Sequence, residues 1–280
     1  MKDRNWQPPR RIERAYASAI KHLLKGLEYQ LRGVSSPFLI VATIRRFARS
    51  PTFKETAGLV AKQMATNVFS DGHKNWRQAA QAGSKGRFIY EALNKELTKT
   101  ATGVAYKAII RENAKLIRSM PEDIARWTAG KIADQYAAGV RHEDIISDIL
   151  ERMPHMARSR AELIARTETS KASTALTRAR SADVGLNWYV WRTSQDSCVR
   201  GSHTHMEGVV VNWNNPPSPE TLIHQKSVGN YHAGDIWNCR CFPAPLILFE
   251  DIQWPAKVYY RGRIERMSLA KFKKLSGGEL

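Results

Sequence analysis

Three cysteines and one histidine are the residues of this 280-residue chain whose types and spacing could do chemistry. Cys239 and Cys241 stand two positions apart in the segment GDIWNCRCFPAP, and Cys198 precedes His203 by five positions. Thiolate and imidazole are the usual ligands of zinc, and four of them close a tetrahedral structural site. The sequence therefore predicts a zinc site formed by Cys198, His203, Cys239 and Cys241, which would stabilise a small domain with long loops.

Other interpretations of this cluster stay open. Cys239 and Cys241 would face the same side of a strand, where both thiols could simply be buried. A disulfide between Cys198 and one of the pair is a third interpretation. Further histidines also make the ligand set ambiguous, namely His205, His224 and His232.

A catalytic alternative uses the same region. A metal-dependent nuclease acting on DNA could hold a cation with His203, His205 and Glu207, and with His232 as a further ligand, because clustered imidazoles beside a carboxylate suit metal-assisted hydrolysis. The chain has no P-loop, no GxGxxG fingerprint and no Gly-x-Ser-x-Gly elbow. We therefore assign no catalytic residue and treat the nuclease as the second hypothesis.

Polar residues beside this cluster are candidates for buried pairing. Arg166 and Glu168 lie in the run IARTETSKAS, within an otherwise apolar helical pattern. Arg240 stands between the two cysteines, where it could pair with Asp196 or Glu168. The alternative is that all four side chains are solvated surface charges.

The positive charge of the chain is unevenly distributed. The formal net charge is +18, and residues 1–100 carry 19 Lys and Arg against seven Asp and Glu. Residues 181–255 carry four against seven, and the last 25 residues carry seven against two. A basic segment of this kind favours a polyanionic partner, here double-stranded DNA. We expect the aromatic residues among these cations to be core residues, with Trp6 as the exception: Trp6, Tyr16, Tyr29, Phe47, Trp76 and Tyr90.

The start of the chain, MKDRNWQPPRR, lacks the apolar stretch of a secretory signal. The longest apolar runs are far shorter than the ~20 residues that span a bilayer. An odd number of cysteines also argues against a secreted disulfide framework. These features predict a protein made in a reducing cytosol, with no membrane partner.

The periodicity of apolar residues predicts an α+β protein. Residues 9–32, 38–50, 52–69, 88–97, 104–120, 121–139, 142–153 and 159–185 have helical spacing, with loops at 71–73 and 82–86. Strands are predicted at 187–193, 207–213, 236–249 and 257–263, followed by a short basic helix or tail. The expected organisation is a basic helical region at 1–154, a small β-rich domain at 155–255 and a basic C-terminal tail at 256–280.

An ordered series of residues runs through the second of these regions. It comprises IARTETSKA, Trp191, the pattern D-x2-VR-x2-H from Asp196 to His203, Gly208, and GDIWNCRC from Gly234 to Cys241. This series resembles the phage Mu F-like head-morphogenesis family of minor head proteins, over about residues 155–248.

The resemblance implies a minor capsid protein of a tailed phage or prophage. Such a protein would act in procapsid assembly in the host cytoplasm, contact the portal and the capsid or scaffold proteins, and end in the virion. Some relatives associate with DNA, and no enzymatic activity follows from the resemblance. Some relatives also carry cysteines at the positions of Arg200 and His203, and Arg200 cannot bind metal.

Overall fold

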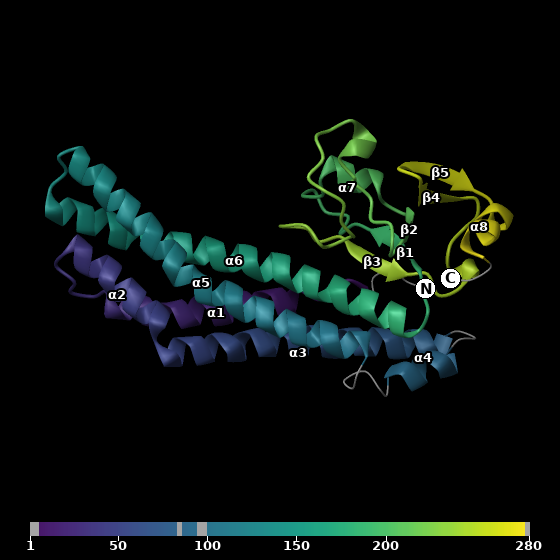
Figure 1. Cartoon of the computed structure of the whole chain (residues 1–280), viewed down its shortest axis with the longest axis horizontal. Coiled ribbons are helices and arrows are strands. Elements are labelled where there is room, and N and C mark those ends of the chain that lie inside the picture. The colour runs from purple at the N-terminus through teal and green to yellow at the C-terminus, as the bar shows by residue number, and fades with distance from the viewer. Residues whose placement is uncertain (1–5, 83–85, 94–99, 278–280) are drawn as a thin grey trace. The chain divides into compact units, whose positions relative to one another are not determined.

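The computed structural model of the chain describes residues 6–82, 86–93 and 100–277. They divide into two compact units. We call residues 10–65 and 108–165 the helical unit, and residues 1–9, 66–107 and 166–280 the sheet unit. The long helices α3 (Pro51–Ala82), α5 (Ala101–Ala137) and α6 (His142–Asp183) each contribute to both units. The predicted α+β class is confirmed, with helices preceding a small sheet (Figure 1).

The helical unit contains α1 (Arg10–Gln30) and α2 (Pro37–Arg49) together with the adjoining parts of the long helices. Apolar residues three and four positions apart form one buried face of α1, since this spacing aligns side chains along a helix: Ile12, Tyr16, Ile20, Leu24 and Leu27. The hydroxyl of Tyr16 donates a hydrogen bond to Oδ1 of Asn113 (2.9 Å), which joins α1 to α5.

Three predicted helix breaks are wrong, because the helices continue through them. Pro121 lies inside α5 and Pro154 inside α6. The predicted loop at 71–73 belongs to α3, where Gly72 lies against the guanidinium of the buried Arg180. The helix predicted at 88–97 corresponds to α4 (Gly86–Leu93). Its last residues, 94–97, lie outside the described residues, as do residues 83–85 of the loop predicted at 82–86.

The aromatic residues follow the expectation in part. Tyr16, Phe47 and Trp76 are buried as predicted. Trp6 is also buried, with its ring edge-on to Trp76 at 5.1 Å, so the exception made for it is wrong. Tyr29, expected in the core, is 71% exposed. The side chain of Tyr90 lies outside what the structure describes.

Five strands form the sheet in the order β3-β1-β2-β4-β5. They are β1 (Trp188–Arg192), β2 (Val210–Asn212), β3 (Phe242–Pro245), β4 (Ala256–Tyr260) and β5 (Arg263–Met267). β2 and β4 are parallel, and the other neighbours are antiparallel. The segment 236–241, predicted as strand, is instead a loop that leads into β3.

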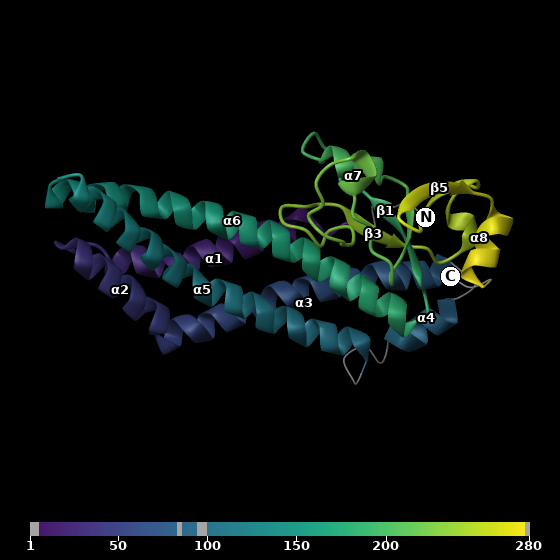
Figure 2. The same cartoon turned by 45° about the horizontal axis from the view of Figure 1, so that its top comes forward.

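The two faces of the sheet carry different layers. Because side chains alternate along a strand, Trp188 and Val190 pack on one face with Phe272 of α8 (Leu269–Ser276). Tyr189 and Trp191 face the other way, in a cluster that includes Cys239 and Cys241. Figures 1 and 2 show α8 and α7 (Gly201–His205) on opposite sides of the strands. The candidate site therefore belongs to the α7 side of the sheet.

Candidate metal centre

His203, Cys239 and Cys241 converge in the sheet unit. All three are buried, and their ligand atoms lie within 4.8 Å of one another. Nδ1 of His203 is 3.5 Å from Sγ of Cys239 and 3.4 Å from Sγ of Cys241. The ring of Trp191 on β1 packs edge-on to the imidazole at 5.6 Å. The group thus rests on the sheet and is closed from one side by an aromatic wall.

The spacing of these atoms fits a tetrahedral zinc ion. Zinc binds thiolate sulfur at about 2.3 Å and imidazole nitrogen at about 2.05 Å, so that adjacent N and S ligands of a tetrahedron lie about 3.5 Å apart. The two observed N–S distances agree with this edge length. Two thiols and one imidazole are also donors that zinc prefers. The residues present therefore fit the ion that the sequence predicts.

A buried polar chain orients the imidazole. Nε2 of His203 lies 3.0 Å from the hydroxyl of Tyr231, which donates to Oε1 of Glu220 at 2.6 Å. Because Tyr231 has one proton and gives it to Glu220, its oxygen accepts from Nε2–H. The unprotonated Nδ1 then faces the thiols. Ser202 also donates to Glu220 (3.1 Å), which anchors the carboxylate. Partners of this kind set the tautomer and orientation of metal-bound histidines.

The two thiols have different proton affinities. A hydrogen bond from the Cys241 thiol lowers the pKa of Cys239, against the opposite effect of burial. The same thiol pair, together with burial, raises the pKa of Cys241 well above its usual range. One thiolate and one thiol are the expected state without a metal. Zinc binding would release the remaining proton, because only the thiolate is a ligand.

Helix α6 holds the loop that carries the cysteines. Oγ1 of Thr174 donates to the carbonyl of Ala233 (2.7 Å), and Oγ1 of Thr167 accepts from the backbone N–H of Asn238 (3.0 Å). Between these contacts lies Gly234, whose φ is +89°. A Cβ there would lie 2.6 Å from Oγ1 of Thr174, so the close approach and the positive φ both require glycine.

Seven of the eight predicted site residues line one pocket of about 140 Å³ beside this centre: Arg166, Asp196, Cys198, His203, Cys239, Arg240 and Cys241. Cys198 is exposed and is not among the three grouped ligand atoms. The backbone N–H of Cys198 donates to Asp196 (3.0 Å), and Arg166 donates to Asn238 (2.7 Å). The eighth residue, Glu168, pairs with Lys171 on its own helix (3.5 Å). The structure therefore brings three of the four candidate ligands together and leaves Cys198 exposed in the lining of the pocket.

The residues of the nuclease hypothesis are not brought together. Glu207 is bonded to Arg192 and to the backbone and hydroxyl of Thr193, which fixes the end of β1. Nδ1 of His232 is hydrogen-bonded to the Tyr189 hydroxyl (3.1 Å). His205 is exposed. Within residues 6–82, 86–93 and 100–277, the one metal-competent group is His203, Cys239 and Cys241.

Sequence reasoning missed the residues that support the ligands. Tyr231 and Glu220 lie in an irregular segment where neither periodicity nor motif marks them. The polar face of the RTETSKAST run was a signal for Thr167 and Thr174, because hydroxyls spaced seven apart lie on one side of a helix. No such pattern pointed to their partners Ala233 and Asn238.

These features define a class: a basic protein of long helices and a small sheet, with a His/Cys/Cys centre on one face of that sheet. Residues 128–243 match the family described as Phage Mu protein F like protein. This confirms the resemblance and assigns that segment to the phage Mu F-like head-morphogenesis family. The match begins 27 positions before the predicted start at residue 155, inside α5, and ends within β3.

One curated relative also shows similarity. An uncharacterized protein of Haemophilus influenzae is 29% identical over 140 residues, which cover 50% of this chain and 29% of that protein. The chain thus spans less than a third of the length of this relative. No solved structure matches the chain. Among the described residues, none of the helices has the length and apolar character needed to cross a bilayer.

Proposed function

We propose that this chain is a minor head protein of a tailed phage or prophage, associated with the portal and acting in procapsid assembly. The match of residues 128–243 to the Mu F-like family carries the proposal. Such a protein would be incorporated into the head in few copies and would contact portal and capsid or scaffold proteins. Mass spectrometry of purified virions and empty procapsids of the encoding phage tests it. Recovery of the chain in both particles is expected, and its absence from both would reject the proposal.

The proposal assigns the His/Cys/Cys centre a structural zinc ion. His203, Cys239 and Cys241 would hold the ion, with the exposed Cys198 of the same pocket as the fourth ligand. When bound, zinc would supply a cross-link between α7 and the loop before β3. The chain's own contribution is the Tyr231–Glu220 pair, which keeps Nδ1 of His203 available.

Elemental analysis tests this assignment. The purified full chain is expected to contain about one zinc per molecule, and Cys239→Ser should lose it. Cys198→Ser separates the fourth ligand from the other three. If Cys198 is a ligand, this variant binds zinc more weakly but does not lose it. Wild-type protein that remains free of metal after zinc is supplied would contradict the assignment.

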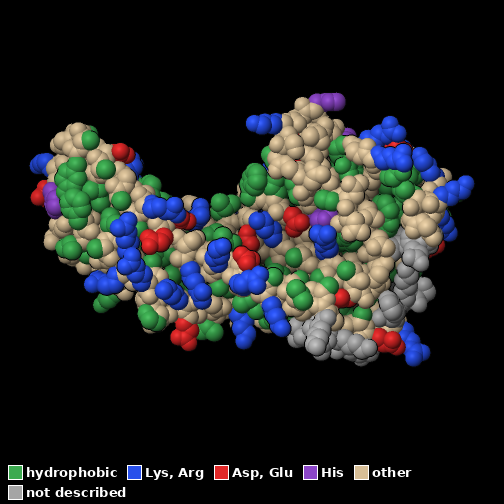
Figure 3. Space-filling view, viewed as in Figure 1, with side chains coloured by type: hydrophobic (Ala, Val, Ile, Leu, Met, Phe, Trp, Pro, Cys, Tyr) green, Lys and Arg blue, Asp and Glu red, His purple; other side chains and the backbone are tan. Residues whose placement is uncertain are grey.

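The helical unit is proposed to contact double-stranded DNA. Residues 10–65 carry 11 Lys and Arg against three Asp and Glu. The three arginines of α2, Arg45, Arg46 and Arg49, are exposed. Figure 3 shows Lys and Arg side chains repeated along the helices, with fewer Asp and Glu among them. Neutralising phosphates releases counterions and gives affinity that does not depend on sequence.

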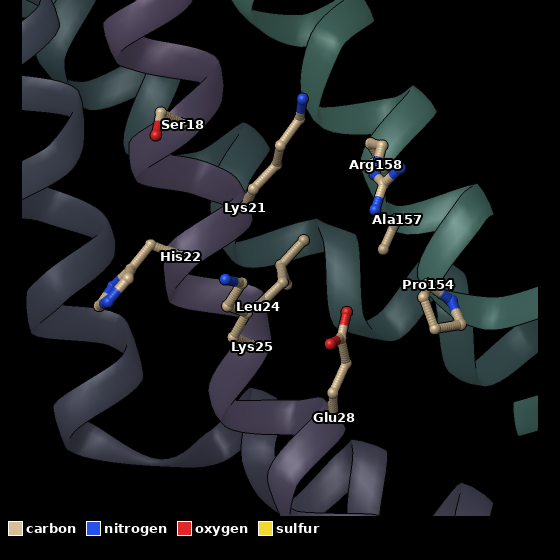
Figure 4. Close-up of a pocket in the computed structure, with 9 residues that line it drawn as sticks. All are labelled: Ser18, Lys21, His22, Leu24, Lys25, Glu28, Pro154, Ala157 and Arg158. Carbon is tan, nitrogen blue, oxygen red and sulfur yellow. The ribbon is translucent and has the colours of Figure 1, made fainter.

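A groove in the same unit adds to this surface. It has a volume of about 350 Å³ and lies between α1 and α6, and its apolar lining residues are Leu24, Pro154 and Ala157. Figure 4 shows Lys21 and Arg158 extending from the two helices into the space between them. Lys21 also forms an ion pair with Glu162 at 2.5 Å. Cations on both sides of the groove favour contact with a phosphate backbone.

Charge variants of the full chain test the DNA contact. Replacing Arg45, Arg46 and Arg49 with Gln should weaken binding and reduce the slope of log K against log salt by about 0.9 for each phosphate that is no longer neutralised. The matched control replaces three exposed cations outside the helical unit, Lys257, Arg261 and Lys274, and removes the same charge. Equal weakening in the two variants would show that the helical unit is not the DNA-binding surface.

A further inference from the structure

Three arginines from separate segments line the same pocket as the candidate metal ligands, and we call it the arginine pocket. Arg166 belongs to α6, Arg200 precedes α7, and Arg240 lies between the two cysteines. Asp196 is the one carboxylate among the residues that line it. Three guanidinium groups face the carboxylate of Asp196 and the thiolate of Cys239, which leaves this small space with an excess of positive charge.

Two of the guanidinium groups are held in place by the loop that carries the cysteines. Nη1 of Arg166 donates to Oδ1 of Asn238 (2.7 Å). Nη2 of Arg200 donates to the carbonyl of Trp237 (2.9 Å), and its guanidinium carbon lies 5.9 Å from the centroid of the Trp237 ring. Because these contacts restrict the side chains, less conformational entropy is lost when an anion binds.

We propose that the arginine pocket binds a phosphate group. A volume of about 140 Å³ is well below the ~300 Å³ at which pockets for drug-sized ligands begin, so the pocket suits one oxyanion and not a whole nucleotide. The planar fork of arginine matches phosphate oxygens in pairs. Phosphate has enough oxygen atoms to accept hydrogen bonds from three guanidinium groups at once, whereas a carboxylate has only two oxygen atoms. The residues of the pocket belong to the sheet unit, whereas the exposed arginines of α2 belong to the helical unit.

Two sources could supply this group: free inorganic phosphate, or the terminal phosphate of a DNA strand. Inorganic phosphate is the first probe, titrated calorimetrically into the full chain with its zinc content measured. Arg240→Gln and Arg200→Gln should each weaken binding about 10–100-fold, because each removes a hydrogen bond between two charged groups. Arg77→Gln, which removes an exposed arginine of α3 in the same unit, should leave it unchanged.

A pair of identical short oligonucleotides, with and without a 5′-phosphate, separates the sources. Tighter binding of the phosphorylated strand that disappears in Arg240→Gln assigns the pocket to DNA ends. Binding of inorganic phosphate without this difference assigns it to the free ion. Absence of saturable phosphate binding by the wild-type chain, or an equal loss of affinity in Arg77→Gln, overturns the proposal. Neither result depends on the α2 variants, so the DNA contact of the helical unit is judged separately.

Discussion

Gly234 is the position where the packing of the cysteine loop on α6 can be tested most directly. Its φ of +89° lies in the region that disfavours side chains. A Cβ at this position would meet three atoms closer than 3.0 Å: Oγ1 of Thr174 at 2.6 Å, the carbonyl oxygen of Cys241 at 2.8 Å and Oγ of Ser170 at 2.9 Å. Gly234→Ala should therefore be strongly destabilising.

The expected magnitude has two parts. Placing a Cβ in the left-handed region costs about 1–2 kcal/mol. Forcing an extra methyl group into a packed site costs about 1–3 kcal/mol more. Gly185→Ala separates the two, because Gly185 also has a positive φ (+68°), but a Cβ there would lie within 4 Å of no atom outside its two chain neighbours. Gly234→Ala should thus lower the free energy of unfolding by about 2–5 kcal/mol. Gly185→Ala should lower it by only the backbone cost of about 1–2 kcal/mol.

Urea denaturation of the two variants measures this difference, and zinc titration follows the same samples. Because the carbonyl of Cys241 is one of the crowded atoms, Gly234→Ala should also weaken zinc binding, while Gly185→Ala should not. If both variants lose the same free energy and bind zinc equally well, the loop is not packed against α6 in the way described.

Further predictions concern the centre and its surroundings. Tyr231→Phe removes the acceptor for Nε2–H of His203 and should weaken zinc binding about 10–100-fold, measured by competition with a chelator. Burial raises the pKa of Asp235 to about 7, so the folded chain holds a proton that the unfolded chain releases near pH 4, and this contribution to stability is lost as the pH rises towards 7. The stability of Asp235→Asn relative to wild type should therefore increase from pH 4 to pH 8, by up to about 4 kcal/mol in urea denaturation, and a pH-independent difference would contradict it. Removal of zinc should accelerate amide hydrogen exchange at residues 231–241 and leave β1 protected; equal acceleration in both would contradict a local role.

The existence and type of most elements could be predicted from the sequence, but not where the helices stop. Proline and glycine are reliable breakers only when nothing outside the segment opposes them. On both sides of Pro121, Met120 and Ile124 are buried, and this burial offsets the backbone hydrogen bond that proline removes. Gly72 lies inside α3 beside the guanidinium of Arg180 and marks no turn. These are tertiary effects that a local pattern does not contain.

The strands show the same limit. β1 was evident from its aromatic and β-branched residues, whereas β5 (Arg263–Met267) reads as a charged segment and was not predicted. β5 pairs with β4 alone and forms an edge of the sheet, where charged side chains are common. The candidate ligands could be selected because zinc chemistry restricts the residue types. Tyr231 and Glu220 could not, since their role arises only when the loop folds against α7.

The position of the centre explains why the effect of removing zinc should be local. Residues 213–241 separate β2 from β3 and contain only one short 3-10 helix, η2 (Thr221–Ile223), among the elements of the structure there. Loops of this length lose much conformational entropy on folding, so they need stabilising contacts with the rest of the domain. The contacts to α6 fix one part of this loop, and the His203 group fixes its end. The sheet has its own apolar layers on both faces. Zinc would therefore contribute chiefly to ordering the loop, and the same ordering positions Trp237 and Asn238 against the arginines of the pocket.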